Sequence, residues 1–149
     1  MFVNSTELQE VFDAKYNTPA FQLAALLLTS PVAFMKGGGM FSAYTQPLWG
    51  KDYMSKKTYG YMNLDEVLEK ATLPPTYLIT SDGDALAHDA TIKAYELLQE
   101  KGIQSEMKNY GNDENGKALP HVFSVLEPFN SSGQEAIDGA LAFYQDVIQ

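Results

Sequence analysis

The first half of the chain is predicted to hold one helix and one strand before its hydrophobic pattern becomes irregular. Thr6 is a residue type that caps helices, and apolar residues follow it at helical spacing, so we expect a helix over residues 6–16. The run Leu23–Thr29 is almost continuously apolar, which is typical of a strand covered on both faces of a parallel sheet. A buried helix has the same pattern, and this alternative stays open.

The second half of the chain alternates predicted strands with predicted helices. Gly102 stands where a glycine commonly ends a helix. The expected elements, in chain order, are a short helix over 63–70, a strand Thr76–Thr80, a helix with Ile92, Tyr95 and Leu98 on one face, a strand Ile103–Tyr110 and a last helix with Ile137, Leu141, Tyr144 and Ile148 on one face. Strands separated by helices imply parallel crossovers, so the expected fold class is α/β, with about three parallel strands and flanking helices.

The segment Met35–Met62 has neither helical nor strand periodicity, yet it holds much of the aromatic content of the chain. A flexible linker is not expected here, because linkers are poor in aromatic residues. Two interpretations stay open. The segment is either an excursion that lines an apolar ligand pocket or a long loop anchored by its aromatic side chains.

Composition limits the classes of protein to which the chain can belong. Its 149 residues suffice for one ordinary domain with a buried core. It has no cysteine, which excludes disulfides and thiolate metal sites, and its net charge of −9 argues against binding to a nucleic-acid backbone. The longest apolar run, Leu23–Leu28, is too short to span a bilayer, and the start lacks the basic and apolar regions of a signal peptide. We therefore expect a cytoplasmic protein with no nucleic-acid partner and no membrane span.

Asp84 and His121 are the candidate catalytic residues. Asp84 follows the predicted strand Thr76–Thr80, and His121 lies in the loop after the predicted strand Ile103–Tyr110. Because the carboxyl ends of parallel strands meet at one edge of a sheet, the carboxylate is expected to reach the imidazole. An Asp that accepts from the imidazole N–H fixes its tautomer and stabilises the imidazolium. Taken singly, Asp84 is a common turn or cap residue and His121 a common packed residue, but their joint placement favours a catalytic pair.

A divalent metal site is a further interpretation of the turn after the strand Thr76–Thr80. Asp82 and Asp84 are paired carboxylates beyond a strand, which is an arrangement that binds such ions, and His88 follows on the next helix. Two carboxylates are few ligands for a metal, however. We therefore expect no metal and no cofactor.

From about Leu23 to its end, the chain resembles the C-terminal half of an α/β-hydrolase of the esterase and lipase branch that includes acetyl esterases. The resemblance rests on residues 73–80, Asp84-Ala85-Leu86, the helix that ends with Lys101-Gly102-Ile103, Tyr110, and His121-Val122-Phe123. It implies a partial α/β-hydrolase fold in which Asp84 is the triad acid, His121 is the triad base, and the excursion at about 35–62 is part of a substrate-binding cap. The loop Gly111–Pro120 is longer than is usual in the family.

The nucleophile of this family is missing. It is a serine in a G-x-S-x-G turn that precedes the acid, and none of the nine serines here has glycine at both positions two residues away. The resemblance therefore implies that residues 1–149 are the C-terminal part of a single domain. The expected function is that of a serine hydrolase of small or short-chain carboxylic esters, present as a segment that is inactive alone.

Two further expectations follow from this missing segment. The alternative function is a non-catalytic ligand-binding or protein-interaction domain derived from the same fold. In either case the apolar strand Leu23–Thr29 is expected to have an open edge, through which the chain self-associates or pairs with a separate N-terminal half.

Overall fold

A computed structural model describes residues 10, 23–36 and 42–149 of the chain. The predicted helix over residues 6–16 lies outside these residues except for Glu10, which is helical. The chain divides into two compact units, which are described separately below. Unit 1 comprises Met1–Leu23 and Ala33–Leu73, and unit 2 comprises Ala24–Val32 and Pro74–Gln149.

Unit 2 is built on a parallel sheet with the strand order β1-β2-β3. Its strands are β1(Leu26–Thr29), β2(Thr76–Ser81) and β3(Ser105–Tyr110). All residues of β2 are buried, because β2 lies between the other two strands and has a helix over each face. The sheet confirms the expected α/β class with three parallel strands.

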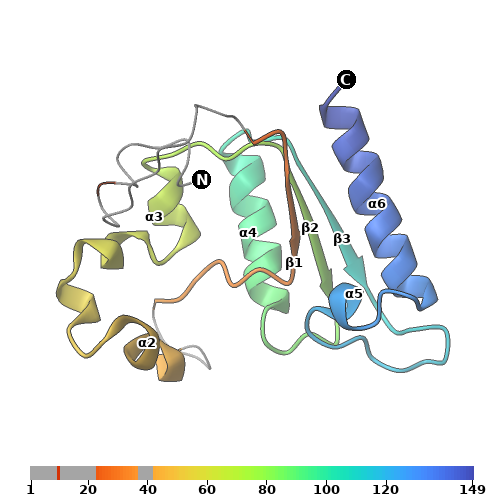
Figure 1. Cartoon of the computed structure of the whole chain (residues 1–149), viewed down its shortest axis with the longest axis horizontal. Helices are drawn as coiled ribbons and strands as arrows, with labels where there is room; N and C mark the ends of the chain where they lie inside the picture. Colours follow the sequence, from red (N-terminus) through yellow and green to blue (C-terminus); the bar gives the residue numbers. More distant parts are fainter. Residues whose placement is uncertain (1–9, 11–22, 37–41) are drawn as a thin grey trace. The chain divides into compact units, whose positions relative to one another are not determined.

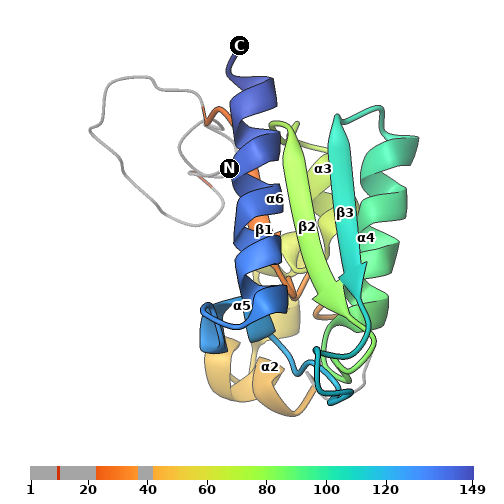
Figure 2. The same cartoon turned by 90° about the vertical axis from the view of Figure 1, so that its right-hand side faces the viewer.

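Two helices of unit 2 cover opposite faces of this sheet (Figures 1 and 2). They are α4(His88–Glu100) and α6(Ser131–Val147), and the one-turn helix α5(Phe123–Leu126) lies beside the carboxyl ends of the strands. As predicted, α4 ends before Gly102, whose φ of +69° is the left-handed conformation that favours glycine after a helix. In the part of the chain that the structure describes, no helix is both long and apolar enough to cross a membrane.

Helix α6 is present as predicted, but it does not bury the predicted face. Leu141, Tyr144 and Ile148 are 50%, 39% and 52% exposed. The buried positions are Gly133, Ala136, Ala140 and Phe143. Small residues let the helix approach the sheet closely: a Cβ at Gly139 would lie only 2.7 Å from the hydroxyl of Tyr77. Close approach by small side chains therefore outweighs the burial of the bulkier stripe.

Strand β1 is shorter and more exposed than predicted. It begins at Leu26 rather than Leu23, and Leu27 is 43% exposed, so the strand is not covered on both faces. The reason is that α4 and α6 pack against β2 and β3. Among the described residues, β1 pairs with β2 alone, which leaves its other edge without a partner strand.

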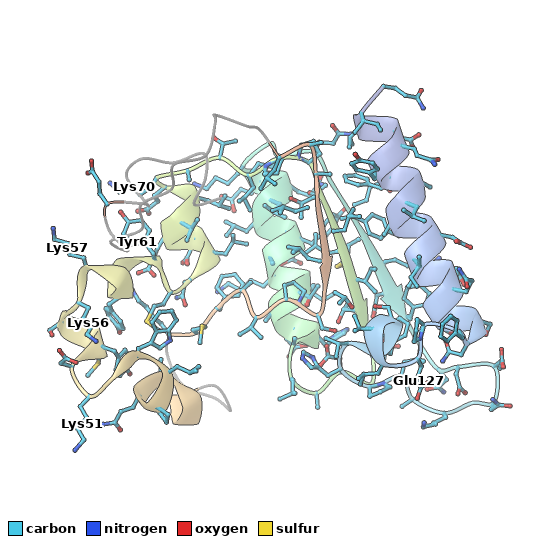
Figure 3. All side chains as sticks on the ribbon, in the orientation of Figure 1. Lys51, Lys56, Lys57, Tyr61, Lys70 and Glu127 are labelled. Atoms are coloured by element: carbon cyan, nitrogen blue, oxygen red, sulfur yellow. The ribbon has the colours of Figure 1, made fainter. Side chains whose placement is uncertain are left out.

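Unit 1 forms short helices where no periodicity predicted any. These are α2(Ser42–Trp49) and the 3₁₀ helices η2(Tyr53–Ser55) and η3(Lys57–Tyr61). The short helix α3(Leu64–Leu68), which was predicted, follows them. The Asn63 side chain ties the unit together, because its Oδ1 accepts hydrogen bonds of 2.9 Å from the N–H groups of both Met35 and Lys36. Lys51, Lys57 and Lys70 extend away from its ribbon (Figure 3). Whether this unit lines a ligand pocket stays a prediction.

The prediction that the chain associates through the edge of β1 also stays a prediction, and Leu27 offers a test. An unpaired apolar edge is a template for another strand, and an edge lysine opposes such pairing. We expect Leu27→Lys to lower the mass that light scattering measures at high protein concentration. Leu126→Lys makes the same charge change at an exposed position of α5 and should leave the mass unchanged. A wild-type chain that stays monomeric would contradict the prediction.

Candidate active site

The turn after β2 buries a carboxylate at the start of α4. Asp84 is 1% exposed as a whole residue, and its side chain has no exposed surface. Its Oδ1 accepts hydrogen bonds from the N–H groups of Leu86, at 3.0 Å, and Ala87, at 2.9 Å. These contacts are those of a turn-forming Asp, which accepts from backbone N–H groups two and three residues further along the chain. The same contacts hold the carboxylate in a fixed orientation.

The segment Leu119–Ser124, which carries His121, is held against the ends of β1 and β2 by three serine hydroxyls. The contacts are Ser81 Oγ to the Leu119 carbonyl at 2.7 Å, the Val122 N–H to Ser30 Oγ at 3.1 Å, and Ser124 Oγ to Thr29 Oγ1 at 2.8 Å. Phe123 in this segment is fully buried and packs edge-on against Tyr110, with ring centroids 5.2 Å apart. The position of the histidine is therefore set by the sheet.

The unusual length of the loop Gly111–Pro120 does not prevent this placement. Asn112 and Ala118 form an antiparallel bridge, and the N–H of Asp113 donates to the Lys117 carbonyl at 2.8 Å. Lys117 also lies 3.5 Å from Glu127, which is at the end of α5 (Figure 3). The additional residues fold back on themselves, so the chain returns to the edge of the sheet before it reaches His121.

Asp84 and His121 lie together at this edge. His121 Nδ1 is 3.0 Å from Asp84 Oδ1 and 3.1 Å from Oδ2, and the His121 side chain is 30% exposed. A carboxylate only accepts, so Nδ1 is the protonated nitrogen and Nε2 carries the lone pair of the neutral ring. Among the contacts of the described residues, every hydrogen bond of the His121 side chain uses Nδ1. Nε2 is thus available to accept a proton.

The pKa of the Asp84 carboxyl lies below its ordinary value of 3.8. Burial is the largest influence and raises this pKa, but hydrogen bonds from the Ser30 hydroxyl, from the Ala87 N–H and from His121 outweigh it. The carboxylate therefore stays ionised at neutral pH although it is withdrawn from water.

Asp82 and His88 do not join this pair. Asp82 Oδ1 accepts a hydrogen bond of 2.8 Å from Asn109, and His88 Nδ1 lies 2.9 Å from the exposed Asp89. A cavity of about 270 Å³ lies beside them and is lined by Asp82, Asp84, Ala85, Leu86, His88, Asp89 and Ala90. Within the described ranges of the chain, no group of three or more acidic or imidazole side chains is arranged to hold a metal ion.

Sequence reasoning missed Gly83 and the serines that support the pair. A Cβ at Gly83 would lie 2.5 Å from the Leu119 carbonyl oxygen, so only glycine lets the turn and the His121 segment approach this closely. The sequence does indicate that Ser30 and Ser81 lie near the site. Both stand at the carboxyl end of an apolar run, where the loops of a parallel sheet gather.

Solved structures that resemble the chain identify its fold. No protein-family model matches the chain, and no curated protein matches it in sequence. Esterase B from Lactobacillus rhamnosis is 24% identical, with a TM-score of 0.75 over 98% of this chain and 47% of that chain. Its complex with a tributyrin phosphonate gives a TM-score of 0.78. The esterase Est2 from the planctomycete Thermogutta terrifontis, with propionate bound, is 18% identical, with a TM-score of 0.62 over 89% of this chain and 46% of that chain.

These likenesses confirm the expected fold. The chain has the fold of part of an α/β-hydrolase, and it shares this fold with part of these esterases. It spans just under half the length of the esterases that it matches.

The lowered pKa of Asp84 predicts how stability depends on pH. Since the carboxyl binds its proton less readily in the folded than in the unfolded chain, the ionised form stabilises the fold above the unfolded pKa, and this contribution is lost as pH falls through the folded pKa. We expect Asp84→Asn to reduce the free energy of unfolding in urea by about 2 kcal/mol at neutral pH, and by progressively less in acid. Asp89→Asn removes the same charge from an exposed side chain and should have little effect. A difference that is constant with pH would contradict the prediction.

Gly83→Ala tests the close approach of the two segments. The added Cβ meets a backbone oxygen, so one segment has to move, and we expect a loss of about 1–3 kcal/mol in the free energy of unfolding. Gly60→Ala is the matched control, because a Cβ there meets no atom within 4 Å. Thermal and urea unfolding measure both variants. Equal stability of Gly83→Ala and the wild type would show that the approach is looser than the structure has it.

Proposed function

We propose that Asp84 and His121 are the acid and base of a serine carboxylic-ester hydrolase. The observation that supports this most directly is the buried carboxylate that holds Nδ1 of a partly exposed imidazole at 3.0 Å and 3.1 Å and leaves Nε2 available. The shared fold with part of several esterases agrees with the assignment. Fold alone does not fix a reaction, so the site carries the proposal.

The proposed reaction follows from the orientation of the imidazole. A serine hydroxyl placed at Nε2 of His121 gives up its proton as its oxygen forms a bond with the ester carbonyl carbon, and Asp84 stabilises the imidazolium that results. The imidazolium then returns the proton to the alkoxide as the bond to the alcohol breaks. Water repeats the two steps on the acyl enzyme and releases the acid. In this scheme His121 alone accepts and returns protons, and Asp84 stays ionised throughout.

The serines nearest the pair are not suited to be the nucleophile. The hydroxyls of Ser30, Ser81 and Ser124 are all engaged in holding the His121 segment, and all three residues are buried. The G-x-S-x-G turn is absent from the 149 residues as well. The proposal therefore requires a nucleophile from a segment other than these, and the open edge of β1 is where we propose that the segment adds a further parallel strand.

We propose esters with short acyl chains as the substrate class. Esterase B has been solved with a tributyrin phosphonate, and Est2 with propionate. Both ligands carry short acyl groups. The aromatic residues of the segment at about 35–62 are proposed to contact such a substrate as a cap, in line with the family resemblance.

Ester hydrolysis by the chain itself is the first half of the test. We expect the purified chain to hydrolyse p-nitrophenyl acetate no faster than its His121→Ala variant, because base and acid without a nucleophile do not form an acyl enzyme. Free imidazole at the same concentration gives the background rate of an unassisted histidine. A robust rate that His121→Ala abolishes would show that a nucleophile is already present.

Completing the site is the second half of the test. The part of Esterase B that this chain does not match is joined to residues 1–149, and circular dichroism verifies that the chimera folds. We expect hydrolysis that falls by about 10⁴-fold or more in His121→Ala and in Asp84→Asn, and that is unchanged in His88→Ala, the matched control at the other histidine. A folded chimera that is inactive, or one whose activity survives His121→Ala, would favour the alternative of a non-catalytic interaction domain.

A further inference from the structure

Ser30 has a strained backbone at the point where β1 ends. Its φ is +47°, in the left-handed region that favours glycine. Pro31 follows, and a residue before proline prefers an extended conformation. Ser30 is nevertheless only 3% exposed, and its N–H still donates to the Ile79 carbonyl at 2.8 Å. A buried residue held in this way requires interactions that compensate for the strain.

Val122, the residue after His121, has the same kind of backbone. Its φ is +51°, and its N–H donates to Ser30 Oγ at 3.1 Å. Across the ranges that the structure describes, Ser30 and Val122 are the two non-glycine residues with positive φ, and they are bonded to each other although 92 positions separate them. Strain that is concentrated at one contact marks a functional constraint more often than a general feature of the fold.

Hydrogen bonding by the Ser30 hydroxyl is also one of the influences that lower the pKa of the Asp84 carboxyl. A hydroxyl has one proton and two lone pairs, so a single oxygen can accept from the Val122 N–H while it donates to the carboxylate. Charge-assisted hydrogen bonds of this type are stronger than neutral ones. One side chain therefore reaches the base of the pair through the adjacent peptide group and also influences the charge of the acid.

We propose that Ser30 is a positioning residue for the Asp84–His121 pair. By accepting from the Val122 N–H it holds the left-handed turn that aims the imidazole, and by hydrogen bonding it favours the ionised form of Asp84, to which Nδ1 donates. The catalytic meaning of this arrangement depends on the proposed function. The positioning itself is a property of the folded chain and is measurable without any hydrolysis.

Two variants separate the hydroxyl from the strain. Ser30→Ala removes the hydroxyl and keeps the unfavourable backbone, whereas Ser30→Gly removes the hydroxyl and relieves the strain, so at least Ser30→Gly should fold. Ser124→Ala is the matched control: it removes another buried hydroxyl that ties the His121 segment to the end of β1, but one that bonds to Thr29 instead of Asp84. NMR on the 149-residue chain reads out all three variants.

We expect three changes in both Ser30 variants. The pKa of Asp84, followed by its side-chain carbon shift, should rise because the ionised form loses a hydrogen bond. Amide exchange at Val122 should accelerate about tenfold because its acceptor is gone. The nitrogen shifts of His121 should show a smaller population protonated at Nδ1. Ser124→Ala should leave the Asp84 pKa and the His121 tautomer at their wild-type values.

Two results would overturn the proposal. One is a folded Ser30→Gly variant in which the Asp84 pKa and the His121 tautomer are unchanged. The other is a Ser124→Ala variant that reproduces the changes, because the effect would then be a general loosening of the His121 segment. Neither result depends on ester hydrolysis, so the positioning role of Ser30 and the proposed enzymatic function fail or hold separately.

Discussion

A carboxylate that is withdrawn from water has to be compensated by hydrogen bonds, and the edge of the sheet at Asp84 is organised by this constraint. The compensation comes from three separate parts of the chain, namely the backbone N–H groups at the start of α4, the imidazole of His121, and the hydroxyl of Ser30 after β1. Each of these parts is itself anchored to the sheet. A change in any one of them alters the environment of the same charge, which couples β1, β2 and the loop after β3.

The long-range placement of the pair could be predicted because it depends on topology. Once β2 and β3 were expected to be parallel neighbours, Asp84 and His121 had to lie at the same edge. The order and type of the periodic elements followed in the same way. The hydrogen bond between Val122 and Ser30 could not be predicted, because both residues adopt a backbone conformation that neither residue type favours, and only the packed structure stabilises it.

The error at α6 has a different physical origin. Periodicity identified the helix but chose its bulkiest stripe as the buried one, whereas the sheet accepts the stripe of Gly133, Ala136 and Ala140 together with Phe143. The bulky stripe and Leu27 of β1 then remain on the surface of unit 2. Exposed apolar surface of this kind commonly marks an interface. The chain spans just under half the length of each matched esterase.

The division into two units separates two parts of the proposed chemistry. Within the described ranges, the groups that contact the Asp84 carboxylate and those that anchor the His121 segment belong to unit 2. Unit 1 has its own contacts, such as the hydrogen bonds of Asn63 and the packing of Lys36 over the ring of Tyr59. If unit 1 selects the substrate and unit 2 holds the acid and base, as proposed, the two roles are expected to respond to substitution independently. A substitution in unit 1 that affects hydrolysis by a completed site should then act on the Michaelis constant, and leave the tautomer of His121 and the pKa of Asp84 as they are.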